Sequence, residues 1–100
     1  MSHETILVVD DEPAIVQVVR DRLTREGFVV RSAPTGEQAL ALVSEDAPDL
    51  IILDLMLPDL DGFEVLRRLR QSGRDEPVIV LTARDDDVDM IVGLEMGADD

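Results

Sequence analysis

Four short apolar runs, each followed by a stretch of helical period, constrain the fold of this chain more than any other feature. The runs are rich in Val, Ile and Leu, and continuous runs of this kind are typical of strands that are buried on both faces. Strands that alternate with helices predict an α/β fold with a parallel sheet and right-handed crossovers. The expected strands cover residues 6–9, 28–33, 50–53 and 78–81.

The stretches between these runs carry signals for helices. Pro13 suits the first turn of a helix, and the apolar residues after it recur at helical spacing until a glycine ends the pattern. Thr35 precedes Gln38 by three positions, and Asp61 precedes Glu64 in the same way, so both places resemble a capping box. The residues expected to face the core from these three helices are Ile15, Val18, Val19, Leu23, Ala39, Leu42, Val43, Phe63, Leu66 and Leu69.

The last part of the chain is expected to form a fourth helix. The acids at 85–87 place negative charge where a helix N-terminus favours it, and Ile91 belongs to an apolar face that ends near Gly97. No further strand follows in the sequence. We therefore expect four strands and four helices in strict alternation, within a single domain over residues 1–100 that is incomplete at its C-terminal end.

The composition excludes several classes of function. Acidic side chains outnumber basic ones 23 to 9, for a formal charge of −14, which repels nucleic acid and anionic lipid. The chain has no cysteine, and hence no thiol nucleophile or thiolate metal site. It also lacks the lysine of a Walker A loop. No apolar run approaches the roughly 18 residues that span a bilayer, and no signal peptide is visible. These features predict a cytoplasmic protein without nucleic-acid or membrane contacts, whose partners are cations and basic surfaces.

Polar side chains stand where the expected strands end. Asp10 and Asp11 follow the first strand, Asp54 follows the third, and Thr82 follows the fourth. Because parallel strands end at the same edge of the sheet, where open α/β sheets bind ligands, we expect these residues to converge. Carboxylates without His or Cys suit Mg²⁺ or Mn²⁺, and a divalent cation relieves their mutual repulsion.

Each of these residues also has a purely structural interpretation. Asp10 and Asp11 can cap the first helix, Asp54 can serve a turn, and Thr82 can be an ordinary β-branched strand residue. Their joint occurrence favours a site. A haloacid-dehalogenase-type phosphatase also presents an Asp nucleophile after an apolar strand, but that family has a second Asp two positions on, where this chain has Met56.

Four motifs in order make the whole chain resemble one family. ILVVDDEP at 6–13, DLIILDLMLPDLDG at 49–62, PVIVLTAR at 77–84 and GADD at 97–100 closely resemble the receiver domain of bacterial two-component response regulators. The resemblance implies a doubly wound, flavodoxin-like sheet of order 2-1-3-4-5, of which this chain lacks the fifth strand and the fifth helix. It implies a signalling domain rather than a turnover enzyme, although a receiver takes part in its own phosphorylation and dephosphorylation.

The resemblance also implies roles for individual residues. Asp54 resembles the aspartate that takes a phosphoryl group from a sensor histidine kinase. Thr82 resembles the switch hydroxyl that turns towards the phosphoryl group, and the small Ala83 would let a backbone N–H approach it. The implied ligands of Mg²⁺ (or Mn²⁺) are Asp10 through water, Asp11, Asp54 and the backbone carbonyl of Met56.

The missing fifth strand leaves two alternatives open. In the family that strand ends in a Lys that contacts the phosphoryl oxygens, and without it the chain can instead be a degenerate docking domain that is not phosphorylated.

The edge of the fourth strand and an apolar stripe would also be uncovered, so we expect rearrangement or self-association, for instance by exchange of the fourth helix between two copies. The LTAR and GADD segments most resemble regulators with a DNA-binding output domain, which implies control of transcription.

Overall fold

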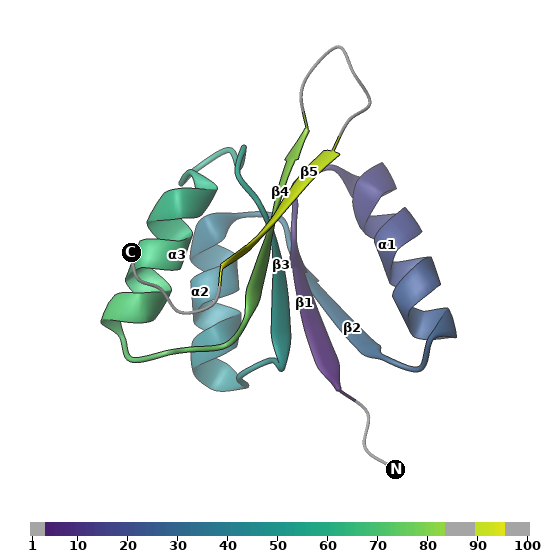
Figure 1. Ribbon diagram of the computed structural model, residues 1–100, viewed down its shortest axis with the longest axis horizontal. Helices are drawn as coiled ribbons and strands as arrows, with labels where there is room; N and C mark the ends of the chain where they lie inside the picture. Colours follow the sequence, from purple (N-terminus) through teal and green to yellow (C-terminus); the bar gives the residue numbers. More distant parts are fainter. Residues whose placement is uncertain (1–3, 84–89, 96–100) are drawn as a thin grey trace.

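A five-stranded sheet organises the molecule, and its strands lie in the order β2-β1-β3-β4-β5 (Figure 1). The computed structural model describes residues 4–83 and 90–95, with side chains over residues 4–81. The first four strands are parallel to one another, which confirms the expected parallel order 2-1-3-4. The elements are β1 (Thr5–Val9), α1 (Pro13–Arg25), β2 (Val29–Ala33), α2 (Gly36–Glu45), β3 (Leu50–Asp54), α3 (Gly62–Gln71), β4 (Val78–Ala83) and β5 (Met90–Glu95).

The expectation of a fourth helix is wrong over Met90–Glu95. This segment is a strand antiparallel to β4, in a register that runs from Val78 opposite Glu95 to Ala83 opposite Met90. The edge of β4 would otherwise present unpaired N–H and C=O groups, and pairing with β5 satisfies them. The helical spacing of the segment is a local signal that this pairing overrides. The expected start of the helix at 85–87 and its end at Gly97 lie outside the described residues.

Two layers of helices flank the sheet. Figure 1 shows α2 and α3 on one face and α1 on the other. No helix within the described ranges has the length and hydropathy needed to cross a bilayer. The core lies between the sheet and the pair of helices α2 and α3, where each fully buried Val, Leu or Ile contributes about 1.5–3 kcal/mol. Its buried residues are Leu7, Val9, Ala33, Ala39, Val43, Ile51, Leu53, Val65, Leu69, Val78 and Val80.

The face of the sheet under α1 is less well covered. In the described part of the chain α1 is the only helix on this face, and none of its residues is buried. Ile15 is 38% exposed and Val18 is 68% exposed, although both were expected to face the core. A helix without a neighbour beside it can press only part of its apolar stripe onto the sheet, so the remainder faces outward.

In α3, one residue that was expected in the core is exposed instead. Phe63 is 59% exposed, whereas Val65 and Leu69 are 1% and 2% exposed. Val65 and Leu69 are four positions apart and share one helix face, while Phe63 stands about 200° around the helix from Val65 at about 100° per residue. Leu69 is buried as expected and Leu66 packs against the core, so only Phe63 is misplaced, and Val65 faces the core instead.

Candidate metal centre

Three carboxylates meet where β1 and β3 end. Val9 pairs with Leu53 in the parallel register of these strands, so the residues that follow emerge side by side at the same edge. Asp10, Asp11 and Asp54 each offer an oxygen within 4.8 Å of the others. The structure thus brings together the three acids that the sequence placed at strand ends, and their oxygen-only donor set is the kind that Mg²⁺ prefers.

Asp10 is the buried member of this cluster, with 7% of its surface exposed. Burial raises the pKa of the Asp10 carboxyl above its ordinary value, and the negative charges of Asp54 and Asp11 raise it further. The Glu12 N–H donates to Asp10 Oδ1 at 2.9 Å, and this hydrogen bond lowers the pKa of the Asp10 carboxyl. Repulsion among these acids therefore makes the site unfavourable for three negative charges until a cation is present.

The capping interpretation of Asp10 and Asp11 does not hold for α1. The N-cap residue of this helix is Glu12, and no side chain caps its first turn. Asp10 instead holds the backbone at Glu12, in the loop before the helix. The side chain of Asp11 is exposed at the edge of the sheet. Both acids are therefore available to a ligand.

Asp54 does make the local turn contact that its structural interpretation suggested. Its Oδ1 accepts a hydrogen bond from the Met56 N–H at 3.1 Å, the geometry of an Asx-type turn. This bond engages one carboxylate oxygen and fixes how the group is oriented. The turn role and a ligand role are compatible, because a carboxylate has two oxygens with about four acceptor positions.

Thr82 and Ala83 end β4 at the same edge. Asp54 pairs with Leu81 in the register of β3 and β4, and the Leu55 N–H donates to the Leu81 carbonyl at 3.2 Å. Thr82 is therefore one residue beyond the partner of Asp54. The GADD segment lies outside the described residues.

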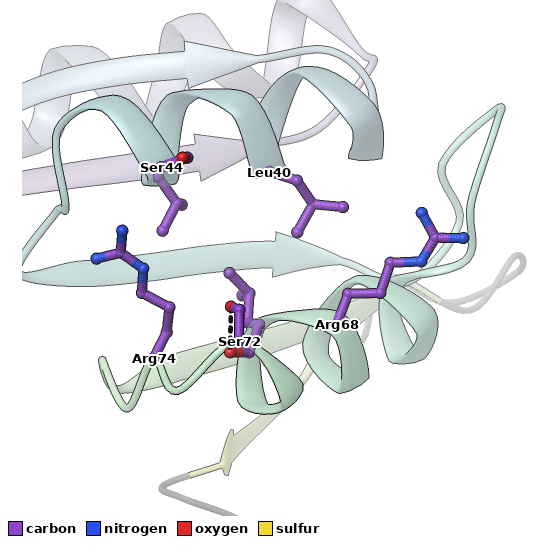
Figure 2. Close-up of a pocket in the computed structure, with 7 residues that line it drawn as sticks. Leu40, Ser44, Arg68, Ser72 and Arg74 are labelled. Carbon is purple, nitrogen blue, oxygen red and sulfur yellow. Dashed lines mark hydrogen bonds between the residues drawn. The ribbon is translucent and has the colours of Figure 1, made fainter.

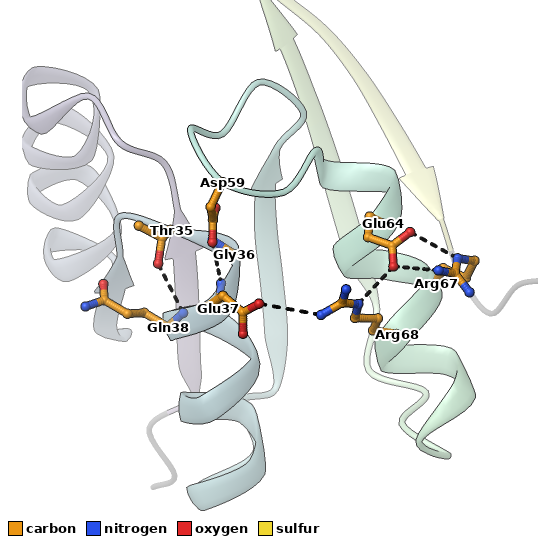
Figure 3. A network of polar contacts seen from close by, with 8 residues as sticks. All are labelled: Thr35, Gly36, Glu37, Gln38, Asp59, Glu64, Arg67 and Arg68. Carbon is orange, nitrogen blue, oxygen red and sulfur yellow. Dashed lines mark hydrogen bonds and ion pairs between the residues drawn. The ribbon is translucent and has the colours of Figure 1, made fainter.

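One residue of the loop after Asp54 has a role that the sequence did not predict. Asp59 accepts hydrogen bonds from the N–H groups of Gly36 and Glu37 at the start of α2, at 2.9 and 3.0 Å (Figure 3). Its neighbour Asp61 caps α3 as expected, by accepting from the Glu64 N–H at 2.9 Å. No local pattern could identify the role of Asp59, because Gly36 is 23 residues away in the sequence.

A groove between α2 and α3 is distinct from the acid cluster. It has a volume of about 410 Å³ and is lined in part by Leu40, Ser44, Arg68, Ser72 and Arg74 (Figure 2). Both arginines already pair with acids, Arg68 with Glu37 and Glu64, and Arg74 with Glu76. Ion pairs of this kind leave little uncompensated charge for an anionic ligand, so the metal centre remains the stronger candidate site.

Comparison with known proteins assigns the family. Residues 6–100 match the response regulator receiver domain. The chain is 51% identical over 96 residues to the transcriptional regulatory protein AfsQ1 of Streptomyces coelicolor, covering 96% of this chain and 42% of that protein. It is 49% identical over 98 residues to the alkaline phosphatase synthesis transcriptional regulatory protein PhoP of Bacillus subtilis, covering 98% and 41%. The chain thus spans about two fifths of the length of these curated relatives.

Solved structures agree with this assignment. The response regulator protein TrrA of Thermotoga maritima, in complex with Mg²⁺ and BeF, has a TM-score of 0.77 and 39% identity, over 82% of this chain and 71% of that one. The N-terminal domain of a response regulator receiver protein from Methanoculleus marisnigri has a TM-score of 0.78 and 44% identity, over 83% and 69%. With its parallel strand order, its three acids at one sheet edge and this match over nearly its full length, the chain belongs to the response regulator receiver domain family.

Proposed function

We propose that this chain is a phosphorylation-controlled switch in which Asp54 accepts a phosphoryl group from a sensor histidine kinase. The observation that carries this proposal is the convergence of Asp10, Asp11 and Asp54, whose oxygens lie within 4.8 Å of one another. Membership of the receiver family supports the same assignment. The proposal describes a signalling domain and not an enzyme that turns over a substrate.

The donor set fits a hard divalent cation. Asp11 and Asp54 would bind Mg²⁺, or Mn²⁺, through their side chains, Asp10 would bind through water, and the backbone carbonyl of Met56 would complete the protein ligands. The raised pKa of the buried Asp10 carboxyl supports this fit, because burial first, and then the negative charges of Asp54 and Asp11, disfavour its ionised form, and a cation offsets that cost. When bound, the ion neutralises charge on the attacking carboxylate and on the phosphoryl oxygens.

Asp54 performs the covalent step. One of its carboxylate oxygens attacks the phosphorus of a phosphohistidine, and the new O–P bond forms as the P–N bond breaks. The electron pair stays on the imidazole, which takes up a proton from solvent. The hydrogen bond from the Met56 N–H holds the carboxylate in one orientation during the attack. The Thr82 hydroxyl and the Ala83 N–H are proposed to hold the phosphoryl oxygens of the product.

Intact-mass measurement tests the proposal. The chain is incubated with Mg²⁺ and acetyl phosphate, beside Asp54→Asn and the control Asp75→Asn, which changes an exposed acid away from the cluster. We expect one phosphate adduct on the wild type and on Asp75→Asn, and none on Asp54→Asn. Folded wild type without an adduct would contradict the proposal. It would favour the docking-only alternative.

The output is proposed from the relatives. AfsQ1 and PhoP are both named transcriptional regulatory proteins, so we propose that this receiver regulates a transcriptional output in the cytoplasm. With a charge of −14, the segment itself would make no contact with nucleic acid or with an anionic membrane.

Self-association is a second proposed property. Ile15 and Val18 on α1 are 38% and 68% exposed, and exposed apolar side chains favour association. Exchange of a fourth helix between copies is not the route, because Met90–Glu95 is a strand. Light scattering over a range of concentrations tests this property, and a monomer at every concentration would contradict it.

A further inference from the structure

Asp59 connects the loop after the phosphoacceptor to the start of α2. Its Oδ1 accepts from the Gly36 N–H and its Oδ2 accepts from the Glu37 N–H, while Thr35 Oγ1 accepts from the Gln38 N–H at 3.1 Å. The first three N–H groups of α2 therefore all have acceptors (Figure 3). Asp59 supplies two of these three acceptors, although it does not precede the helix in the sequence.

The same loop is also fixed where it leaves β3 and where it enters α3. The Gly62 N–H donates to the Leu55 carbonyl at 3.0 Å, which closes the loop at its base. Asp61 caps α3 at the entry to that helix. Met56 stands between the closed base and Asp59. Leu57 packs against the core between them, and the bonds of Asp59 to α2 are the first side-chain hydrogen bonds after Met56 along the loop.

Packing brings α2 against this loop independently of the hydrogen bonds. A Cβ built at Gly36 would lie 3.1 Å from Leu60 Cβ and 2.8 Å from Val65 Cγ2, so the start of α2 lies directly against the loop and α3. Arg68 of α3 also pairs with Glu37 of α2 at 3.6 Å, and with Glu64 of its own helix at 2.8 Å. The loop therefore lies against both the start of α2 and α3.

The contact selects the ionised form of Asp59. The Gly36 N–H, followed by the Glu37 N–H, lowers the pKa of the Asp59 carboxyl below its ordinary value. The positive end of the α2 dipole also favours a carboxylate at this place. At neutral pH the carboxylate is therefore charged and engages α2 through both oxygens.

We propose that Asp59 is a positioning residue for the metal centre, because it anchors the loop over residues 55–61 on α2 and thereby fixes Met56 beside Asp54. This inference rests on the proposed function, in which the Met56 carbonyl and the Asp54 carboxylate bind the cation. Groups that orient metal ligands from outside the ligand set typically change metal affinity by about 10–100-fold when they are removed. A residue that merely caps a helix has no such effect on metal affinity.

The matched pair Asp59→Ala and Thr35→Ala separates these two roles. Both variants remove a cap from the same end of α2, but only Asp59 belongs to the loop. Mg²⁺ affinity is measured by calorimetric titration at neutral pH, and unfolding is followed by circular dichroism in urea. We expect both variants to lower the urea midpoint, and only Asp59→Ala to weaken Mg²⁺ binding, by about tenfold. Asp59→Asn keeps one acceptor oxygen and should fall between wild type and Asp59→Ala.

Amide hydrogen exchange of the metal-free chain gives a readout that does not depend on Mg²⁺. Exchange at the Met56 N–H should accelerate in Asp59→Ala and stay as in wild type in Thr35→Ala. Equal Mg²⁺ affinity and equal Met56 exchange in the two variants would overturn the positioning role and leave Asp59 as a cap. If wild type itself binds no Mg²⁺ and gains no phosphate, the proposed function fails and the positioning role fails with it. Wild type that binds Mg²⁺ normally, with no difference between the variants, overturns only the positioning role.

Discussion

Gly62 lies against the backbone of Leu55 so closely that no side chain fits between them. A Cβ at Gly62 would be 2.8 Å from Leu55 Cα and 2.8 Å from the Asp54 carbonyl oxygen. The Gly62 N–H also donates to the Leu55 carbonyl. The first residue of α3 is thus in contact with the residue that follows the proposed phosphoacceptor, and the start of that helix and the end of β3 cannot move independently.

Gly62→Ala should destabilise the protein by about 1–3 kcal/mol, because the new methyl group would displace backbone. Gly36→Ala is the matched comparison: it is also the first residue of a helix, and its Cβ would meet the side chains of Val65 and Leu60 instead of backbone. We expect the smaller loss from Gly36→Ala. Urea unfolding followed by circular dichroism measures both, since the chain has no Trp or Tyr to report by fluorescence. Equal or reversed losses would contradict this account.

Asp11→Asn should weaken Mg²⁺ binding by about tenfold or more, because a direct ligand matters at least as much as the groups that orient it. Glu12→Gln is the control: it removes one negative charge from the next residue, which is not in the acid cluster. Calorimetric titration should find the affinity of Glu12→Gln close to that of wild type. Equal losses in the two variants would mean that Mg²⁺ responds only to general negative charge.

Asp10→Asn should stabilise the metal-free protein at neutral pH. The folded state raises the pKa of the Asp10 carboxyl above its ordinary value of 3.8, so the ionised carboxylate favours the unfolded chain. As the pH falls through that raised pKa, wild-type Asp10 takes up a proton in the folded state and the advantage of Asn should shrink. It should vanish below about pH 3.8. Urea midpoints in EDTA from pH 3 to 7 check this, and a pH-independent difference would refute it.

With excess Mg²⁺, wild type should become more stable than Asp10→Asn, which is the reverse of the order expected in EDTA. Excess Mg²⁺ should raise the urea midpoint of wild type more than that of Asp10→Asn, because a ligand that binds only the folded state stabilises it by mass action. Equal gains would argue against a contribution of Asp10 to the metal site.

Val65→Ala should cost about 2 kcal/mol, since two buried methyl groups are lost at about 0.8 kcal/mol each and a small cavity remains. Val18→Ala makes the same change in another helix, where the side chain is 68% exposed instead of 1%. It should stay within about 0.5 kcal/mol of wild type. A large loss in Val18→Ala would show that the α1 face is covered in solution, for example by a second copy.

Much of the metal centre followed from the sequence because it depends on a topological rule. Parallel strands end at one edge, so acids directly after β1 and β3 had to meet once those strands were recognised. The caps at Thr35 and Asp61 were equally local, since each side chain bonds an N–H three residues ahead. The roles of Thr82 and Ala83 remain predictions that rest on the family resemblance.

Tertiary structure decided the remaining features, because each depends on a partner that is distant in the sequence. Asp59 reaches an N–H group 23 residues away, and Met90–Glu95 becomes a strand because β4 offers it an edge. Val18 is exposed because no helix lies beside α1 among the described elements. Phe63 is exposed because of the direction from which α3 packs on the sheet. Periodicity and capping residues fix a local conformation, but which face is buried and which edge is paired depend on what the rest of the chain places beside it.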